Sequence, residues 1–235
     1  PEQGTGPDVF IPLAEKTGFI KQLGAYAFKE ACRQAKRWHD AGQALSVSVN
    51  LSVKQLQQDT IVAELKQILD EVGLDPRLLE LEITESAAMT DVEKNISKLT
   101  ALRDLGLHIA IDDFGTAYSS LNYLKRLPVT SLKIDKSFVE DITEADGGDS
   151  ANAAIIRAVV ALGKSMGFKL IAEGIETEVQ RRFLTSLGCE EAQGFLFSKA
   201  LPAQKASELI NVAALASKSP PDVSVRLVES SFPHS

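Results

Sequence analysis

The sequence predicts an α/β fold built on parallel strands. Short apolar runs rich in β-branched residues alternate with amphipathic stretches of helical period along most of the 235 residues, a pattern typical of parallel strands joined by crossover helices. The composition, 44% hydrophobic and 24% charged, is that of a globular protein with a substantial core. We expect one domain over residues 1–216 and a flexible tail over residues 217–235, where two adjacent prolines and the lack of helical period argue against a further element.

In the first half of the chain, helical and extended periodicities follow one another. Residues 20–41 are expected to form a long amphipathic helix, and the stretch before it, residues 7–18, a loop. The run LSVSVNL at 45–51 is the first predicted strand. Apolar residues at helical spacing predict a helix over 53–72, LLELEI at 78–83 the second strand, and a further helix ending near Gly106.

The second half continues the alternation. HIAID at 108–112 is the third predicted strand; we expect Asp112 to be its last regular residue and Asp113 to lie where the chain leaves the sheet. TSLKID at 130–135 and KLIAEG at 169–174 are the fourth and fifth strands, and residues 190–197 hold a short sixth. Helices are predicted over residues 153–167, 178–188 and 203–216.

Six strand–helix units favour a (β/α)₈ barrel whose first strand or strands lie upstream of Pro1, because such a barrel has eight strands and typically about 250 residues. The alternative is a doubly wound open sheet, which usually carries a Gly-rich phosphate turn after its first strand. Neither GxGxxG nor GxxxxGK[ST] occurs in the sequence. We therefore expect a TIM-like barrel.

Charge and composition exclude several classes of protein. The net charge of −7 argues against binding of a nucleic-acid polymer, which needs clustered Lys and Arg. No apolar run approaches the roughly 18 to 20 residues of a membrane helix. Cys32 and Cys189 form no CxxC pair and indicate buried, reduced cysteines of a cytoplasmic protein rather than a zinc site or a disulfide framework.

Polar side chains stand at the end of every predicted strand. They are Asn50, Glu82, Asp112 with Asp113, Lys133, Glu173 and Gln193. In a parallel barrel the carboxyl ends of all strands open on one rim, where active sites lie. One such residue would more often be solvated or cap a helix, but six strand ends that all carry a carboxylate, an amide or an ammonium favour a common site.

The donor set indicates metal ions. Several carboxylates in one place repel one another unless cations neutralise them, and ligands that are all oxygen atoms favour Mg²⁺ or Mn²⁺ over zinc. Adjacent aspartates suit a two-metal site, and paired ions usually serve in-line displacement at phosphorus. Lys133 would then orient the attacking water or offset phosphate charge.

Seven ordered blocks of the sequence resemble the signature blocks of one family, the EAL-domain cyclic di-GMP phosphodiesterases. The blocks are FIPLAEKTG, SVNLS, LELEITES, AIDDFGTAYSSL, LKID, KLIAEGIET and EAQGFLFSKAL, and the resemblance covers roughly residues 7–210. It implies a TIM-like barrel that hydrolyses cyclic di-GMP to linear pGpG with two Mg²⁺ or Mn²⁺ ions.

The resemblance also implies roles for individual residues. The first metal would be held by Asn50, Glu82 and Asp112, and the second by Asp112, Asp113 and Glu173. Lys133 would hold the hydrolytic water, with Lys133, Glu173 and Asp113 as the catalytic set. Substrate contacts would come from Gln193, Glu176, Phe195 and Pro12, and support of the surrounding loops from Glu85, Asp135 and Gly115.

Two departures from the family pattern bear on activity. The Glu-Ala-Leu motif, whose glutamate is a metal ligand, is not in the chain and is expected upstream of Pro1, so the site as given lacks one ligand and the activity of this fragment by itself stays open. Ala117 stands where relatives usually carry glycine; if that position needs a positive φ, alanine costs on the order of 1 kcal/mol.

Two other functions stay open. A degenerate EAL domain would bind cyclic di-GMP as a sensor without cleaving it, and a barrel enzyme of the enolase kind would use a different ring of acids. The resemblance implies a homodimer, and upstream sensor or GGDEF-type domains in a full-length protein that is sometimes anchored in a membrane.

Overall fold

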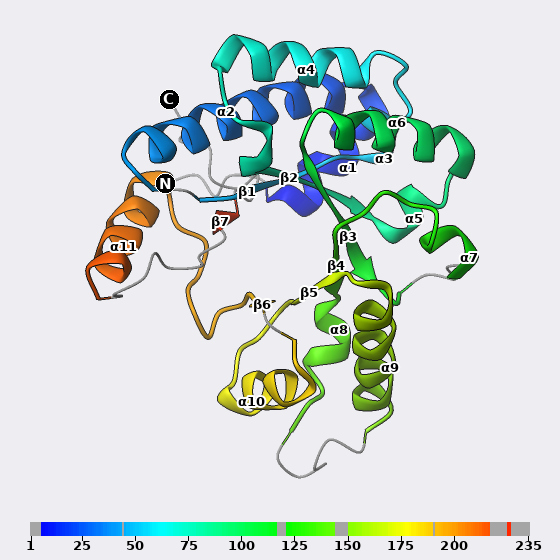
Figure 1. Ribbon diagram of the computed structural model, residues 1–235, viewed down its shortest axis with the longest axis vertical. Coiled ribbons are helices and arrows are strands. Elements are labelled where there is room, and N and C mark those ends of the chain that lie inside the picture. Colours follow the sequence, from blue (N-terminus) through cyan, green and yellow to red (C-terminus); the bar gives the residue numbers. More distant parts are fainter. Residues whose placement is uncertain are drawn as a thin grey trace. The chain divides into compact units, whose positions relative to one another are not determined.

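The computed structural model describes residues 6–43, 45–116, 121–143, 150–189, 191–216 and 225–226 (Figure 1). The chain divides into two compact units. The first consists of Pro1–Leu81, Ala101–His108 and Ala200–Ser235, and the second of Glu82–Thr100 and Ile109–Lys199.

The first unit is built around one long helix. Its elements are α1 (Pro7–Thr17), α2 (Ile20–Asp40), β1 (Val47–Asn50), α3 (Val53–Leu56), α4 (Ile61–Val72), the 3₁₀ turn Pro76–Leu78, the start of β2 (Leu79–Thr84), α11 (Ala203–Ala216) and β7 (Val225–Arg226). Helix α2 packs against α1, α3, α4 and β1 (Figure 1). It buries a stripe that includes Phe28, Cys32 and Trp38, and the Trp38 indole N–H donates to Ser207 Oγ of α11 at 2.8 Å.

Two predictions in the first unit are wrong. Residues 7–18, expected to be a loop, contain helix α1. Pro7 occupies its first turn, where a missing N–H costs no hydrogen bond, and packing of α1 against α2 with Ala14 buried outweighs the cost of Pro12 inside the helix.

The single helix expected over 53–72 is two helices, α3 and α4. Leu56 and Ile61 are both buried, but five residues on one continuous helix would place them about 140° apart. The break at residues 57–60 lets both side chains enter the core. A capping box between Ser52 and Gln55 stabilises the short helix α3.

The second unit carries the parallel sheet. Its strands are the end of β2, β3 (His108–Phe114, from Ile109), β4 (Ser131–Ile134), β5 (Lys169–Ala172) and β6 (Glu191–Ala192). Its helices are α5 (Glu85–Ala88), most of α6 (Val92–Asp104), α7 (Leu121–Leu124), α8 (Lys136–Val139), α9 (Ala151–Met166) and α10 (Glu178–Leu187).

Neighbouring strands of this sheet pair in sequence order. Strand β3 pairs with β4, β4 with β5 and β5 with β6, all parallel, and α9 packs on β4, β5 and α8 (Figure 1). Parallel neighbours present their carboxyl ends at one edge. The predicted α/β class with parallel strands is confirmed.

The expected tail from residue 217 stays a prediction. Of these residues the structure describes only Val225–Arg226, which form β7 parallel to β1. Among the described residues, no helix combines the length and the apolar character that a membrane span requires.

Candidate functional site

Five strands bring polar side chains to the carboxyl edge of the sheet in the second unit. Glu82 lies near the end of β2, Asp112 and Asp113 on β3, Lys133 on β4, Glu173 directly after β5, and Gln193 directly after β6. We call the four acids Glu82, Asp112, Asp113 and Glu173 the carboxylate cluster. The predicted convergence of these strand ends is thereby observed for the second unit.

Lys133 is the centre of the cluster. Its side chain is 2% exposed, and its Nζ lies 2.8 Å from Glu82 Oε2 and 2.6 Å from Glu173 Oε1, and also contacts Asp112 Oδ1. The three partner carboxylates are themselves largely buried, at 5% to 14% exposure. A buried charge is tolerated only when it is paired, so the ammonium compensates part of the negative charge that the cluster concentrates here.

The two adjacent aspartates share one side of β3 because the strand is bulged. Ile111 pairs with Leu132 and Phe114 with Ile134, so two residues of β3 stand opposite the single residue Lys133. Asp113 has φ 53°, a left-handed conformation that is uncommon outside glycine. Such a bulge re-aims a side chain that regular alternation would send to the opposite face.

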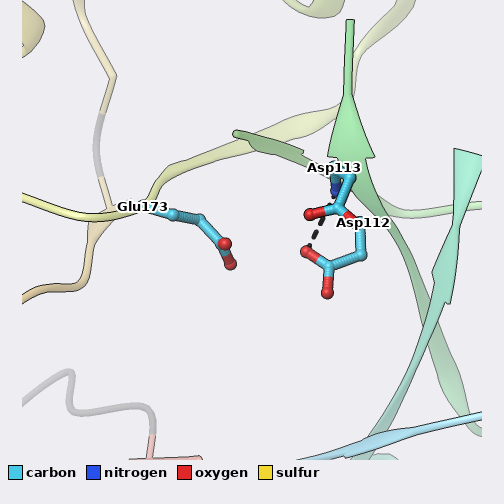
Figure 2. Close-up of side chains that lie close together, drawn as sticks. All are labelled: Asp112, Asp113 and Glu173. Carbon is cyan, nitrogen blue, oxygen red and sulfur yellow. Dashed lines mark hydrogen bonds between the residues drawn. The ribbon is translucent and has the colours of Figure 1, made fainter. Parts of the chain in front are cut away.

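The expected end of the third strand at Asp112 is therefore wrong. Strand β3 continues through Asp113 to Phe114, and it is the bulge, not the end of the strand, that frees Asp113 from the alternation. Figure 2 shows Glu173 pointing toward both aspartates from the segment after β5. One carboxylate oxygen from each of Asp112, Asp113 and Glu173 lies within 4.8 Å of the others.

The crowding of carboxylates affects the pKa of Asp113. Burial, followed by the charges of Asp112 and Asp135, raises the pKa of the Asp113 carboxyl from 3.8 to about 6. Burial acts upward on the pKa of Asp135 as well, but hydrogen bonds from the Ser137 hydroxyl and backbone N–H outweigh it, and the pKa of Asp135 is lowered. Asp113 therefore holds its proton more tightly than an ordinary aspartate.

Glu85 braces the turn that follows the aspartates. It is buried at the first position of α5, and its Oε2 accepts the backbone N–H of Gly115 at 2.9 Å. Gly115 has φ 101°, and a Cβ there would lie 2.9 Å from Phe138 Cε2, so both conformation and space favour glycine. Residue Ala117, singled out in the sequence, lies outside the described residues.

Gln193 touches the cluster directly. Its Nε2 donates to Glu173 Oε1 at 2.7 Å, the same oxygen that faces Lys133 Nζ. The turn that carries Gln193 lies tightly against the segment after β5, because a Cβ on Gly194 would overlap backbone atoms of Ile175. The Lys133 ammonium and the Gln193 amide thus both hold Glu173 in place.

The structure does not test the roles predicted for the remaining site residues. Asn50 ends β1 in the first unit and is exposed, and Pro12 lies exposed in α1. Glu176 and Phe195 are exposed in the second unit, with Lys199 Nζ 5.8 Å from the centre of the Phe195 ring. Their roles stay predictions.

Gln180 is not among the predicted site residues. This side chain is buried in α10 and hydrogen-bonds to the backbone after β5. The signal was present, since T-x-x-Q at residues 177–180 is a capping-box pattern that marks a helix start.

The chemistry of the cluster fits divalent cations. Carboxylate oxygens are the ligands that Mg²⁺ and Mn²⁺ prefer, and carboxylates this close to one another favour binding of cations. Glu82, Asp112, Asp113 and Glu173 would hold such ions. These four acids are among the strand-end residues from which the sequence predicted a metal site.

Comparison with known proteins identifies the family. The family model described as "EAL domain" matches residues 1–200. The bifunctional diguanylate cyclase/cyclic di-GMP phosphodiesterase MucR of Pseudomonas aeruginosa is 47% identical over 200 residues, which are 85% of this chain and 29% of MucR. The cyclic di-GMP phosphodiesterase NbdA of the same species is 42% identical over 212 residues, 89% of this chain and 27% of NbdA.

A solved structure extends the likeness to the fold. The structure described as "PaMucR Phosphodiesterase, c-di-GMP complex" superposes with a TM-score of 0.83 at 46% identity, over 88% of this chain and 83% of that one. This likeness confirms the predicted TIM-like α/β class. The chain spans less than a third of the length of the curated relatives named here. Over residues 1–200, the chain belongs to the EAL domain family.

Proposed function

We propose that this chain is a metal-dependent phosphodiesterase that hydrolyses cyclic di-GMP to linear pGpG. The observation that carries the proposal is the buried contact of Lys133 with Glu82, Asp112 and Glu173, with Asp113 turned to the same side by the bulge. Relatives of the chain are named as cyclic di-GMP phosphodiesterases, and the chain keeps every acid that the family pattern places between Glu82 and Glu173.

The charge balance supports a role for cations in this reaction. Four carboxylates face one ammonium, so an anionic phosphodiester would be repelled by the cluster alone. In the proposal, Glu82 and Asp112 would be ligands of one Mg²⁺ or Mn²⁺, and Asp112, Asp113 and Glu173 would be ligands of the other. Such a pair of ions activates water and stabilises charge on the phosphate oxygens.

Other side chains would orient the reacting groups. Lys133 Nζ, on the strand opposite the bulge, would donate to the attacking water and hold it beside Glu173. Gln193 would fix the Glu173 carboxylate through its 2.7 Å contact, and Glu85 would keep the turn at Gly115 in place. Glu176 and Phe195 would contact the nucleotide.

Turnover of cyclic di-GMP by the purified protein, with the upstream segment in which the Glu-Ala-Leu motif is expected, tests the proposal. With Mn²⁺ present, chromatography should detect pGpG, and Glu173→Gln should lower kcat at least about a hundredfold, as expected when a metal ligand and catalytic carboxylate is lost. Glu178→Gln is the matched control, because Glu178 is exposed and contacts Arg181 and Arg182 on the surface of α10.

Two other outcomes of this assay would count against parts of the proposal. Nucleotide binding without pGpG in this longer protein would favour the alternative of an inactive EAL domain that senses cyclic di-GMP. Equal turnover by the wild type and Glu173→Gln would refute the assignment of the site.

We also propose that the chain works within a larger cytoplasmic or membrane-tethered signalling protein and forms a homodimer. The larger protein is supported by the length of relatives such as MucR, which is more than three times that of the matched region, and by the name of MucR as bifunctional. The homodimer is proposed from the resemblance to the family. Light scattering of the chain at several concentrations would test the dimer.

A further inference from the structure

A buried glutamine ties the segment after β5 to helix α8. Gln180 is 4% exposed, and its Oε1 accepts the backbone N–H groups of Glu176 at 2.8 Å and Thr177 at 2.9 Å. Its Nε2 donates to the carbonyl of Val139 at 3.2 Å. All of these contacts reach backbone atoms, so the side chain joins two segments that are distant in sequence.

The segment held in this way has no regular secondary structure between residues 173 and 176. The Glu173 N–H donates to the Ile134 carbonyl at 3.1 Å, and the Ile175 N–H to the Gln193 carbonyl at 3.0 Å. A Cβ on Gly174, whose φ is 66°, would lie 2.5 Å from Lys136 Cβ. The segment therefore lies directly on the start of α8, and Gln180 anchors its far end to the last residue of the same helix.

Glu173 depends on this anchoring because it stands at the other end of the segment. Its carboxylate contacts Lys133 Nζ at 2.6 Å and Gln193 Nε2 at 2.7 Å. Rotation of the backbone at Gly174, the residue type with the widest conformational freedom, would move that carboxylate away from both partners.

We infer that Gln180 is a positioning residue for Glu173: by bracing Glu176 and Thr177 against Val139, it holds the Glu173 carboxylate where the proposed phosphodiesterase needs a metal ligand. This inference rests on the proposed function. Side chains that orient metal ligands typically change metal affinity or activity 10- to 100-fold when they are replaced, on the order of the effect expected here.

The competing explanation is that Gln180 only caps α10. Thr177 Oγ1 accepts the Gln180 N–H at 3.3 Å, and the pair forms a capping box. Two substitutions separate the explanations. Thr177→Ala removes the side-chain cap but leaves the Gln180 side-chain contacts, whereas Gln180→Glu keeps an acceptor suited to a capping box and loses the donor to Val139.

The experiment compares the 235-residue wild type with Gln180→Met, Gln180→Glu and Thr177→Ala. Amide hydrogen exchange is measured without metal or nucleotide, and Mn²⁺ affinity by titration calorimetry. In Gln180→Met, exchange at Glu173 and Ile175 should accelerate at least tenfold and Mn²⁺ affinity should fall about 10- to 100-fold. Gln180→Glu should change both in the same direction, and Thr177→Ala should leave both near the wild-type values.

Wild-type exchange at Ile175 and wild-type Mn²⁺ affinity in both Gln180 variants would overturn the inference. If Gln180→Met does not fold, Gln180→Glu decides, because a helix cap alone would tolerate glutamate. Failure of the protein with its upstream Glu-Ala-Leu motif to cleave cyclic di-GMP would count against the proposed function only, since the exchange measurement needs no nucleotide.

Discussion

Replacing Lys133 by methionine removes the ammonium from between Glu82, Asp112 and Glu173 and keeps a long, unbranched side chain in its place. The three carboxylates then face one another without the cation that contacts all of them. Like charges in a poorly solvated site repel strongly. We expect the folded state of the metal-free protein to lose stability.

The burial of the groups sets the size of the loss. Removing one partner of a buried ion pair costs about 3–5 kcal/mol. Lys133 is 2% exposed and has three carboxylate partners, but Asp112 and Glu173, at 14% exposure, keep some contact with water. We therefore expect a loss of about 3 kcal/mol, a large share of the roughly 5–15 kcal/mol that stabilises a typical domain.

Lys169→Met is the matched control. Lys169 lies on β5 of the same sheet and also contacts a carboxylate, that of Glu191, but its side chain is 48% exposed. Exposed ion pairs contribute about 0–1 kcal/mol. Urea unfolding followed by far-UV circular dichroism, in EDTA, gives the free energy of unfolding of both variants and the wild type.

Manganese supplies a second readout from the same samples. Mn²⁺ at about a hundred times its Kd adds about 2.7 kcal/mol to a protein that binds it only when folded. At one fixed Mn²⁺ concentration the gain should be larger in Lys133→Met than in the wild type, because the cation replaces the missing ammonium and therefore binds with a lower Kd. If Lys133→Met loses no more stability than Lys169→Met, and Mn²⁺ stabilises it no more than the wild type, the compensating role of Lys133 is refuted.

Two further predictions concern the bulge and the turn at Gly194. The pKa of Asp113 is raised to about 6, so the folded state gains stability from its proton below the ordinary value of 3.8 and loses this gain as the pH rises through 6. Asp113→Asn should therefore stabilise the metal-free protein above about pH 6, by about 1 kcal/mol after discounting for partial exposure. Urea unfolding of the variant and the wild type measures this effect, and the same difference in stability at pH 5 and at pH 8 would contradict it. Gly194→Ala should cost about 2 kcal/mol or more, because its Cβ would overlap backbone atoms of Ile175. Gly42→Ala, at a positive φ with open space around it, should cost only about 1 kcal/mol, so equal melting temperatures for the two variants would argue against the clash.

Hydrophobic periodicity located most of the elements. All six predicted strands exist, and α11 begins and ends where the sequence indicates. The failures occurred where packing overrode local signals. Helix α1 forms despite Pro12 because it packs against α2, and residues 53–72 break into two helices because Leu56 and Ile61 both need burial.

The sequence by itself determined which residues stand at the strand ends, because alternation and strand length are local properties, and those residues predicted an oxygen-ligand site. Only the tertiary structure decided how they meet. The bulge that turns Asp113 beside Asp112 depends on the register between β3 and β4, and the contact of Lys133 with three acids depends on neighbouring strands. Gln180 could be recognised as more than a cap only from its contact with Val139, 41 residues away in sequence, because a contact between distant segments leaves no periodic trace in the chain.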